Sequence, residues 1–405
     1  MMTSARKIFS SEFLLSLSLV LVSQTRFRLA DGVGPGEIGL AILILTTFLG
    51  IFSPRFELFV PKRYGFAWLL VLFGLFVLTP ITLLNAETGM RGPVPRDILA
   101  YLLSFLLVFT AIVRRLDLAS VASFTVILMC LVFTGQYLLG GDQAWYLSAR
   151  FSAGSDNPNQ LALYLVCGFL MIAMTDWRLP VKSLFAGALI AFGILSQSDA
   201  FMLATLAMAG SWTAFRLVPR AWFPAFLLFG TLPIAIGILF LATQTDLLAD
   251  IQSIWAHSNG GSERSILYIN GIKAYLSTPV AWPFGFGAGG YSGNTGPFGG
   301  QEAHNTIIDC LTIGGVALVA LVHWPLLRTL WEAYSLKRYA IAATIVGLLV
   351  FTMFHFVGRQ PVFWFTVIAA IQSLYGLEVR ERTLRRHTKD PITDAPSMPG
   401  GGLHA

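Results

Sequence analysis

The feature that most constrains this chain is a series of apolar runs, most of them close to 20 residues long. Inside a bilayer every backbone polar group must be satisfied within the protein, so a spanning segment is a helix of about 20 residues or a barrel strand of about 10. The run length favours helices, and we predict an all-α integral membrane protein with about twelve transmembrane helices. The predicted spans are 11–29, 35–52, 64–84, 98–113, 118–139, 160–175, 183–197, 199–215, 221–242, 306–324, 339–356 and 362–377.

Composition excludes a water-soluble catalytic domain, because 55% of the 405 residues are hydrophobic and only 12% are charged. The net charge of +6 does not indicate a nucleic-acid partner, since its distribution follows the predicted topology. Of the 27 Lys and Arg residues, 19 lie in connections on one side of the predicted spans. The positive-inside rule therefore predicts that both termini are cytoplasmic.

The predicted spans divide the chain into four regions. Glu12 and the lack of a small-residue cleavage site indicate that the first run is an uncleaved signal anchor. In the large outer loop, apolar spacing predicts a surface helix near 246–255, and Ser262 is a candidate N-cap for a second helix to about 277. The regions are nine spans with short loops (1–242), the large loop (243–305), three further spans (306–377) and a disordered cytoplasmic tail (378–405).

Two arginines are expected beside helix N-termini in the outer loops. Arg150 precedes a helix for which Asn157 is a predicted N-cap, with Pro158 at the first helical position. Glu263 and Arg264 fall in the first turn of the loop helix, where a cation opposes the helix dipole unless an anion lies between them. The pattern indicates an anion site. Two alternatives stay open: Arg150 extends to lipid headgroups, and Glu263 simply neutralises Arg264.

His304 directly precedes Asn305, the predicted N-cap of the span that starts near Thr306. Upstream, the segment 285–290 matches G-x-G-x-x-G but lacks the strand and helix that dinucleotide binding requires, so the glycines predict turns and close backbone approach. Glu302, His304 and Asp309 form a short cluster without the ligand set of a metal site. No metal is therefore expected there.

The following motifs resemble the O-antigen ligase and O-antigen polymerase superfamily: Arg150-x-Ser152-x-Gly154-x-x-Asn157-Pro158-Asn159, Arg264 opening a loop helix, Pro283-Phe284-Gly285-Phe286-Gly287, and His304-Asn305. Their order, spacing and membrane side agree across most of 60–375. The resemblance implies a glycosyltransferase of the bacterial inner membrane that acts on its periplasmic face. The implied donor is a glycan on a polyprenyl diphosphate, and the implied acceptor is a lipid A core or another lipid-linked glycan. Neither a metal nor another cofactor is expected.

Given such a donor, each candidate residue has an expected role. His304 is the candidate base for the acceptor hydroxyl, attacking from the face opposite the diphosphate and inverting the anomeric centre. Arg150 and Arg264 are expected to bind the diphosphate. Asp199 occupies a position that is often basic in the family, and Arg359 on the last outer loop is a candidate replacement charge. The candidate supporting residues are Asn157, Asn159, Glu263 and Asn305.

Two questions stay open at this stage. The motifs do not distinguish a ligase, a polymerase and a protein-glycosylating relative. The number of spans also suits a secondary transporter or a flippase of lipid-linked glycans, although the chain has no visible repeat of the kind on which many transporters are built.

Overall fold

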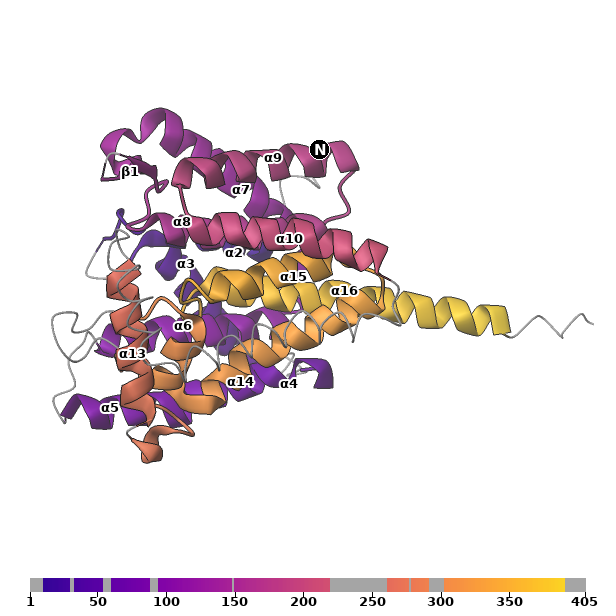
Figure 1. The fold of residues 1–405 in the computed structure, drawn as a ribbon. Helices are drawn as coiled ribbons and strands as arrows, with labels where there is room; N and C mark the ends of the chain where they lie inside the picture. Colours follow the sequence, from indigo (N-terminus) through magenta and orange to yellow (C-terminus); the bar gives the residue numbers. More distant parts are fainter. Residues whose placement is uncertain are drawn as a thin grey trace, which may run out of the picture.

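The computed structural model describes residues 10–29, 33–53, 60–87, 94–147, 149–218, 261–276, 278–290 and 302–389. These residues form a bundle of helices, as Figure 1 shows. Within them the strands amount to one two-residue antiparallel pair, β1 (Trp145–Tyr146) and β2 (Arg150–Phe151), with Trp145 opposite Phe151. The predicted all-α class is confirmed for the part of the chain that is described.

The helices fall in chain order as follows. The first half contains α2 (Ser11–Val22), α3 (Pro35–Ile51), η1 (Lys62–Tyr64), α4 (Gly65–Phe73), the π-helical η2 (Gly74–Leu78), α5 (Thr79–Glu87), α6 (Val94–Val113), α7 (Leu118–Leu139) and η3 (Gly141–Ala144). The second half contains α8 (Pro158–Met174), α9 (Leu179–Ser196), α10 (Asp199–Leu217), α13 (Gly261–Leu276), η5 (Pro279–Ala281), α14 (Thr306–Ser335), α15 (Tyr339–Thr352) and α16 (Pro361–Lys389).

Five helical stretches in the described ranges are long and apolar enough to cross a membrane. They are Lys62–Asn85, Leu118–Leu139, Leu179–Ser196, Asp199–Leu217 and Thr306–Ser335. Six further apolar helices are shorter, at 10–17 residues. Each predicted span coincides with one of these helices except 221–242, which lies outside the described residues, as does the predicted surface helix at 246–255.

Three helix ends lie well away from the predicted ones. α14 continues to Ser335, past the predicted end at 324. α2 ends at Val22 and not near residue 29, because the polar residues that follow turn onto the loop after α7. The Gln24 amide donates to the Ala153 carbonyl at 2.8 Å, and the Arg26 guanidinium donates to the Gln143 carbonyl at 2.7 Å. At the other end of the chain, α16 continues to Lys389, past the predicted end at 377; residues 390–405 of the predicted tail lie outside the described part.

Small residues let neighbouring helices approach closely. In Figure 1, α15 and α16 lie between the layer of α7–α10 and the layer that contains α4, α5 and α14. A Cβ at Gly347 of α15 would lie 2.3 Å from the Met208 side chain of α10, and one at Gly36 of α3 would lie 2.3 Å from the Val22 backbone nitrogen. Contacts of this kind hold helices together in lipid, where the hydrophobic effect between them is weak.

Aromatic side chains fix α16 against α6. Phe105 meets Trp364 edge to face at 5.5 Å between ring centroids, and Tyr101 lies 6.3 Å from Phe356. The Trp364 indole also donates to the Gly358 carbonyl at 2.7 Å. This packing holds the turn before α16 in place, and that turn carries Arg359.

α14 is broken at Gly315, where φ is +64° and the helix is interrupted. The segment 282–287 docks onto the break and pairs with the freed backbone groups through four hydrogen bonds: Val316 N to Trp282 O, Ala317 N to Pro283 O, Phe286 N to Thr312 O and Gly287 N to Ile313 O. A Cβ at Gly285 or Gly315 would lie 2.4 Å from backbone atoms of the partner segment. The prediction that the glycine cluster serves turns and close backbone approach is thus confirmed.

Candidate functional site

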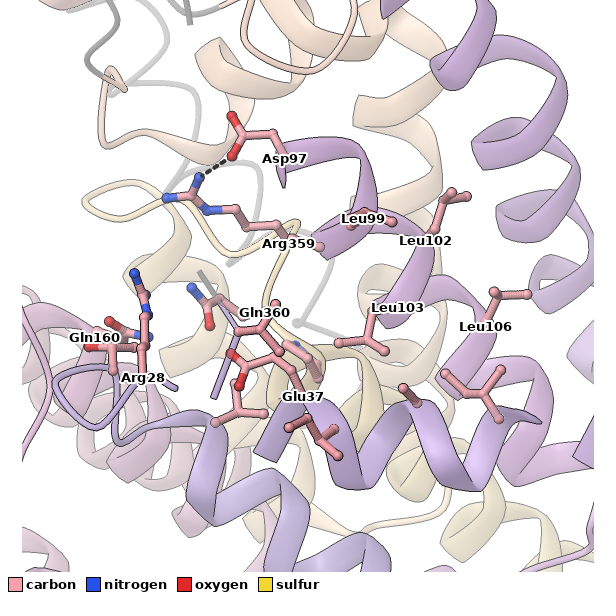
Figure 2. Close-up of a pocket in the computed structure, with 18 of the residues that line it drawn as sticks. Arg28, Glu37, Asp97, Leu99, Leu102, Leu103, Leu106, Gln160, Arg359 and Gln360 are labelled. Carbon is pink, nitrogen blue, oxygen red and sulfur yellow. Dashed lines mark hydrogen bonds and ion pairs between the residues drawn. The ribbon is translucent and has the colours of Figure 1, made fainter. Parts of the chain in front are cut away.

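A cavity of about 960 Å³ lies between α3 and α6. Most of its wall is apolar and comes from one face of each helix. Figure 2 shows the α6 leucines along one side, with Arg28, Gln160 and Gln360 gathered toward the other end. The apolar lining includes Ile38, Ala41, Ile44, Leu45 and Phe48 from α3, and Leu99, Leu102, Leu103 and Leu106 from α6.

A second cavity of about 260 Å³ adjoins the polar end of the first. We call the larger one the groove and the smaller one the chamber. Asp156, Asn157, His355 and Phe356 line the chamber alone. The residues that line both, and so form the boundary between them, are Arg28, Gln160, Glu302, His304, Arg359 and Gln360.

The first residues of five helices lie along the groove or at its boundary with the chamber. Glu37, Asp97 and Gln160 line the groove from the first turns of α3, α6 and α8. Pro361 is the first residue of α16, and His304 lies two residues before α14. The N-terminus of each helix carries roughly half a positive charge on its unpaired N–H groups. These N-termini add partial positive charge to an end of the groove that also carries Arg28 and Arg359 and the acidic side chains of Glu37, Asp97 and Glu302.

The backbone around His304 is held by Asp309, which is fully buried in the first turn of α14. Its carboxylate oxygens accept hydrogen bonds from the backbone nitrogens of Ala303 at 2.8 Å and Asn305 at 3.2 Å. Between these two residues His304 adopts φ +56°, a left-handed conformation that is uncommon for residues other than glycine. Strained backbone of this kind clusters at functional sites.

His355 lies next to His304. The two rings are nearly parallel, with an interplanar angle of 9° and centroids 6.2 Å apart. Their loops are tied together, because the Thr306 hydroxyl donates to the His355 carbonyl at 2.7 Å and the Asn305 amide donates to the Met353 carbonyl at 3.0 Å. Both imidazoles line the chamber.

Arg359 is clamped between two buried carboxylates. Its guanidinium lies 2.7 Å from Glu302 and 3.3 Å from Asp97, whose side chains are 11% and 5% exposed. Burial raises the pKa of Glu302 above its usual value, while Arg359 acts to lower it and Asp97 to raise it. The positive charge of Arg359 is therefore compensated inside the protein.

Arg150 is not among the residues that line the two cavities. Its guanidinium donates to the carbonyls of Ser196 at 3.1 Å and Gln197 at 3.0 Å, which satisfies the C-terminal end of α9. The Ser198 hydroxyl donates to Asn159 at 2.8 Å. Arg150 and Asn159 thus fasten the α9–α10 connection to the start of α8, and the predicted role of Arg150 at a diphosphate stays a prediction.

The other predicted residues fall into two groups. Asn157 and Asn305 are the N-caps of α8 and α14, as predicted, and Asn157 also lines the chamber. Glu263 and Arg264 lie in the first turn of α13, again as predicted, but their side chains lie outside the described part of the structure. Asp199 is in the first turn of α10, where an acidic residue suits the helix dipole.

Sequence reasoning missed Arg28 and Asp97. Arg28 falls at the end of the run 11–29 that is predicted as the first span, so its position gives no indication of a role. A signal in the sequence could have identified the connection between α2 and α3. Arg26 and Arg28 lie just beyond the first apolar helix, and Pro35 opens the next one.

No model of a known protein family matches the chain, and no curated protein matches it. Among the described residues, no group of three or more His, Cys, Asp and Glu side chains could hold a metal ion.

Proposed function

We propose that this protein is a membrane-embedded glycosyltransferase that moves a glycan from a polyprenyl diphosphate to the hydroxyl of an acceptor sugar. One observation carries the proposal: an apolar groove opens at one end onto arginines, a histidine and five helix N-termini. A ligand that fits both parts has a long apolar tail and an anionic head. A polyprenyl diphosphate has this form.

The groove suits the polyprenyl tail, because α3 and α6 line it mostly with aliphatic side chains. The diphosphate then lies at the polar end. Transfer breaks the bond between the anomeric carbon and the diphosphate oxygen, which leaves with the electron pair. Cations and helix N-termini stabilise the charge that develops on the phosphate oxygens, so the protein does not need a strong general acid there.

His304 is the proposed general base. An imidazole titrates near neutral pH and can accept the proton of the acceptor hydroxyl as its oxygen attacks the anomeric carbon. The Asp309 clamp presents His304 at the boundary of groove and chamber. Attack from the side opposite the leaving diphosphate inverts the anomeric configuration.

The proposed setting is the bacterial inner membrane, with about twelve spans, cytoplasmic termini and a periplasmic site. The excess of Lys and Arg on one side of the spans supports this orientation. The common position of the five helix starts also supports it, since alternating spans bring every second helix start to one face. Membrane lipids would surround the bundle.

The break in α14 bears on the rival transporter function. Secondary transporters place broken helices at mid-membrane and use the freed backbone groups to bind substrate or ions. At Gly315 four of those groups are hydrogen-bonded to the 282–287 segment. The described break therefore serves loop docking, which favours the enzyme over the transporter.

The deciding experiment uses the full-length protein purified in detergent, where no gradient exists. We expect it to convert a polyprenyl-diphosphate-linked glycan and a sugar acceptor into product, detected by mass spectrometry. A flippase or transporter would leave both compounds chemically unchanged. His304→Ala is expected to abolish turnover while donor binding is retained. His323→Ala is the matched control, because His323 lies far along α14 and its ring contacts the Val319 carbonyl.

A second comparison separates the possible acceptors. Transfer to a lipid A core indicates a ligase, and transfer to a second lipid-linked glycan indicates a polymerase. Normal turnover by His304→Ala would refute the assignment of His304 as the base.

A further inference from the structure

Arg28 stands where the groove and the chamber meet, in the connection between α2 and α3. We propose that Arg28 binds the diphosphate of the lipid-linked donor, so that the tail lies in the groove and the reacting sugar lies in the chamber. This inference rests on the proposed function and assigns the head of that ligand to a specific side chain. Figure 2 shows Arg28 next to Gln160 at the polar end of the groove.

The backbone that carries Arg28 is held in place on both sides. Before it, the Arg26 nitrogen donates to the Gly154 carbonyl at 3.1 Å, and Thr25 accepts from the Asp156 nitrogen at 2.8 Å. After it, the Leu29 nitrogen donates to the Val33 carbonyl at 3.0 Å. A guanidinium on a fixed connection is already positioned for a ligand, which reduces the entropy lost on binding.

The ion pairs of Arg28 and Arg359 differ in length and exposure. The Arg359 guanidinium lies 2.7 and 3.3 Å from the carboxyl groups of Glu302 and Asp97, whose side chains are 11% and 5% exposed. Arg28 faces Asp156 across 3.8 Å, and the Asp156 side chain is 56% exposed. An ion pair that is this long and this exposed is weak in water. A diphosphate carries more charge than one carboxylate and can displace Asp156 from Arg28.

The guanidinium group also suits the chemistry of the ligand. Its planar set of N–H donors can bond two phosphate oxygens at once and stays charged at any physiological pH. Placed at the boundary, a diphosphate on Arg28 would direct the anomeric carbon toward the chamber, where His304 and His355 lie. The donor would then cross the boundary with its scissile bond beside the proposed base.

The test measures binding of a sugar-free polyprenyl diphosphate to the full-length protein in detergent, with native mass spectrometry to obtain Kd. Arg28→Gln is expected to weaken binding about tenfold or more, because charge-assisted hydrogen bonds are lost. Asp156→Asn is expected to tighten binding about twofold to fivefold, since the competing carboxylate is removed. A gain in affinity does not arise from misfolding, so the second variant remains informative if the first folds poorly.

Arg328→Gln is the control for a lost arginine charge, because Arg328 is 47% exposed and lies about six turns along α14 from Asn305. It should bind like the wild type. Wild-type affinity in Arg28→Gln, or no tightening in Asp156→Asn, would overturn the assignment of Arg28 and leave the proposed function standing. If the wild-type protein does not bind polyprenyl diphosphate, the inference and the proposed function both fail.

Discussion

Removal of the Asp309 carboxylate should lower the turnover of the site and leave its affinity for the donor nearly unchanged. In Asp309→Ala the backbone nitrogens of Ala303 and Asn305, now bonded at 2.8 and 3.2 Å, lose their acceptor. Each buried donor left unsatisfied costs about 1–3 kcal/mol. The variant should therefore lose at least about 2 kcal/mol of the free energy that holds the 303–305 segment and the left-handed His304 in place.

The expected kinetic effect follows from that magnitude. At about 1.36 kcal/mol per tenfold change, 2 kcal/mol lowers the fraction of correctly placed imidazole roughly thirtyfold. The loss should appear in kcat of glycan transfer, while KM for the lipid-linked donor changes little, because the arginines and the groove remain. Asp309→Asn keeps one acceptor oxygen and should lose about half as much free energy.

The matched control is Asp117→Ala. The Asp117 carboxylate also accepts from two backbone nitrogens, those of Ala119 and Ser120, but it caps the exposed start of α7. The Asp117→Ala variant should lower the free energy of unfolding somewhat and leave kcat unchanged. If a folded Asp309→Ala protein keeps kcat within about threefold of the wild type, or loses affinity for the donor and not turnover, the positioning argument is wrong.

Three further outcomes are expected. Gly315→Ala should lower the thermal unfolding temperature, because the added Cβ would lie 2.4 Å from the Phe284 nitrogen and the backbone φ is +64°. Gly210→Ala is the control and should keep the wild-type unfolding temperature, because its Cβ meets open space. Equal stability of the two variants would contradict the docking geometry. Glu302→Gln should become more stable relative to the wild type as pH rises above about 4.5. The raised pKa of Glu302 means that its protonated form stabilises the folded wild type, and this stabilisation is lost as the carboxyl ionises. Unfolding temperatures of the two proteins that change in parallel across pH would show that burial does not control this residue. Arg264→Lys should lose most transfer activity despite its retained charge, because a lysine cannot replace the guanidinium fork, and a fully active variant would assign Arg264 a merely interfacial role.

Local signals in the sequence predict much of this fold. The apolar runs identify the described helices, and the residue types at positions 157, 158 and 305 identify two helix starts, because capping depends on neighbours a few residues away. The helix predicted to begin after Ser262 is present as α13, but it begins at Gly261, so Ser262 lies in its first turn and is not its N-cap. Properties set by adjacent residues can be read from one chain.

The partners of charged side chains could not be predicted in the same way. Arg150 was expected at a diphosphate, yet its guanidinium meets carbonyls 46 and 47 residues away, at the end of α9. The clamp on Arg359 joins Asp97 and Glu302 from distant parts of the chain. Such pairings depend on how helices pack, and helix packing leaves no periodic signal in the sequence.

The break in α14 could not be predicted from the sequence either, because it also depends on how distant segments pack. Gly314 and Gly315 lie in an apolar run that predicts an ordinary span, and the break exists because the 282–287 segment supplies partners for the freed backbone groups. Only the loop glycines hinted at it, through their number and spacing.

The break links α14 to α13 through the segment that docks into it. Tyr275 of α13 and Trp282 hold each other through two reciprocal hydrogen bonds, at 2.7 and 3.0 Å, and the segment from Trp282 onward is docked into the break. The short helical piece before the break carries Asp309, which accepts hydrogen bonds from the backbone nitrogens on both sides of His304. A short series of hydrogen bonds thus connects α13, through the docked segment and the first part of α14, to the backbone on both sides of His304.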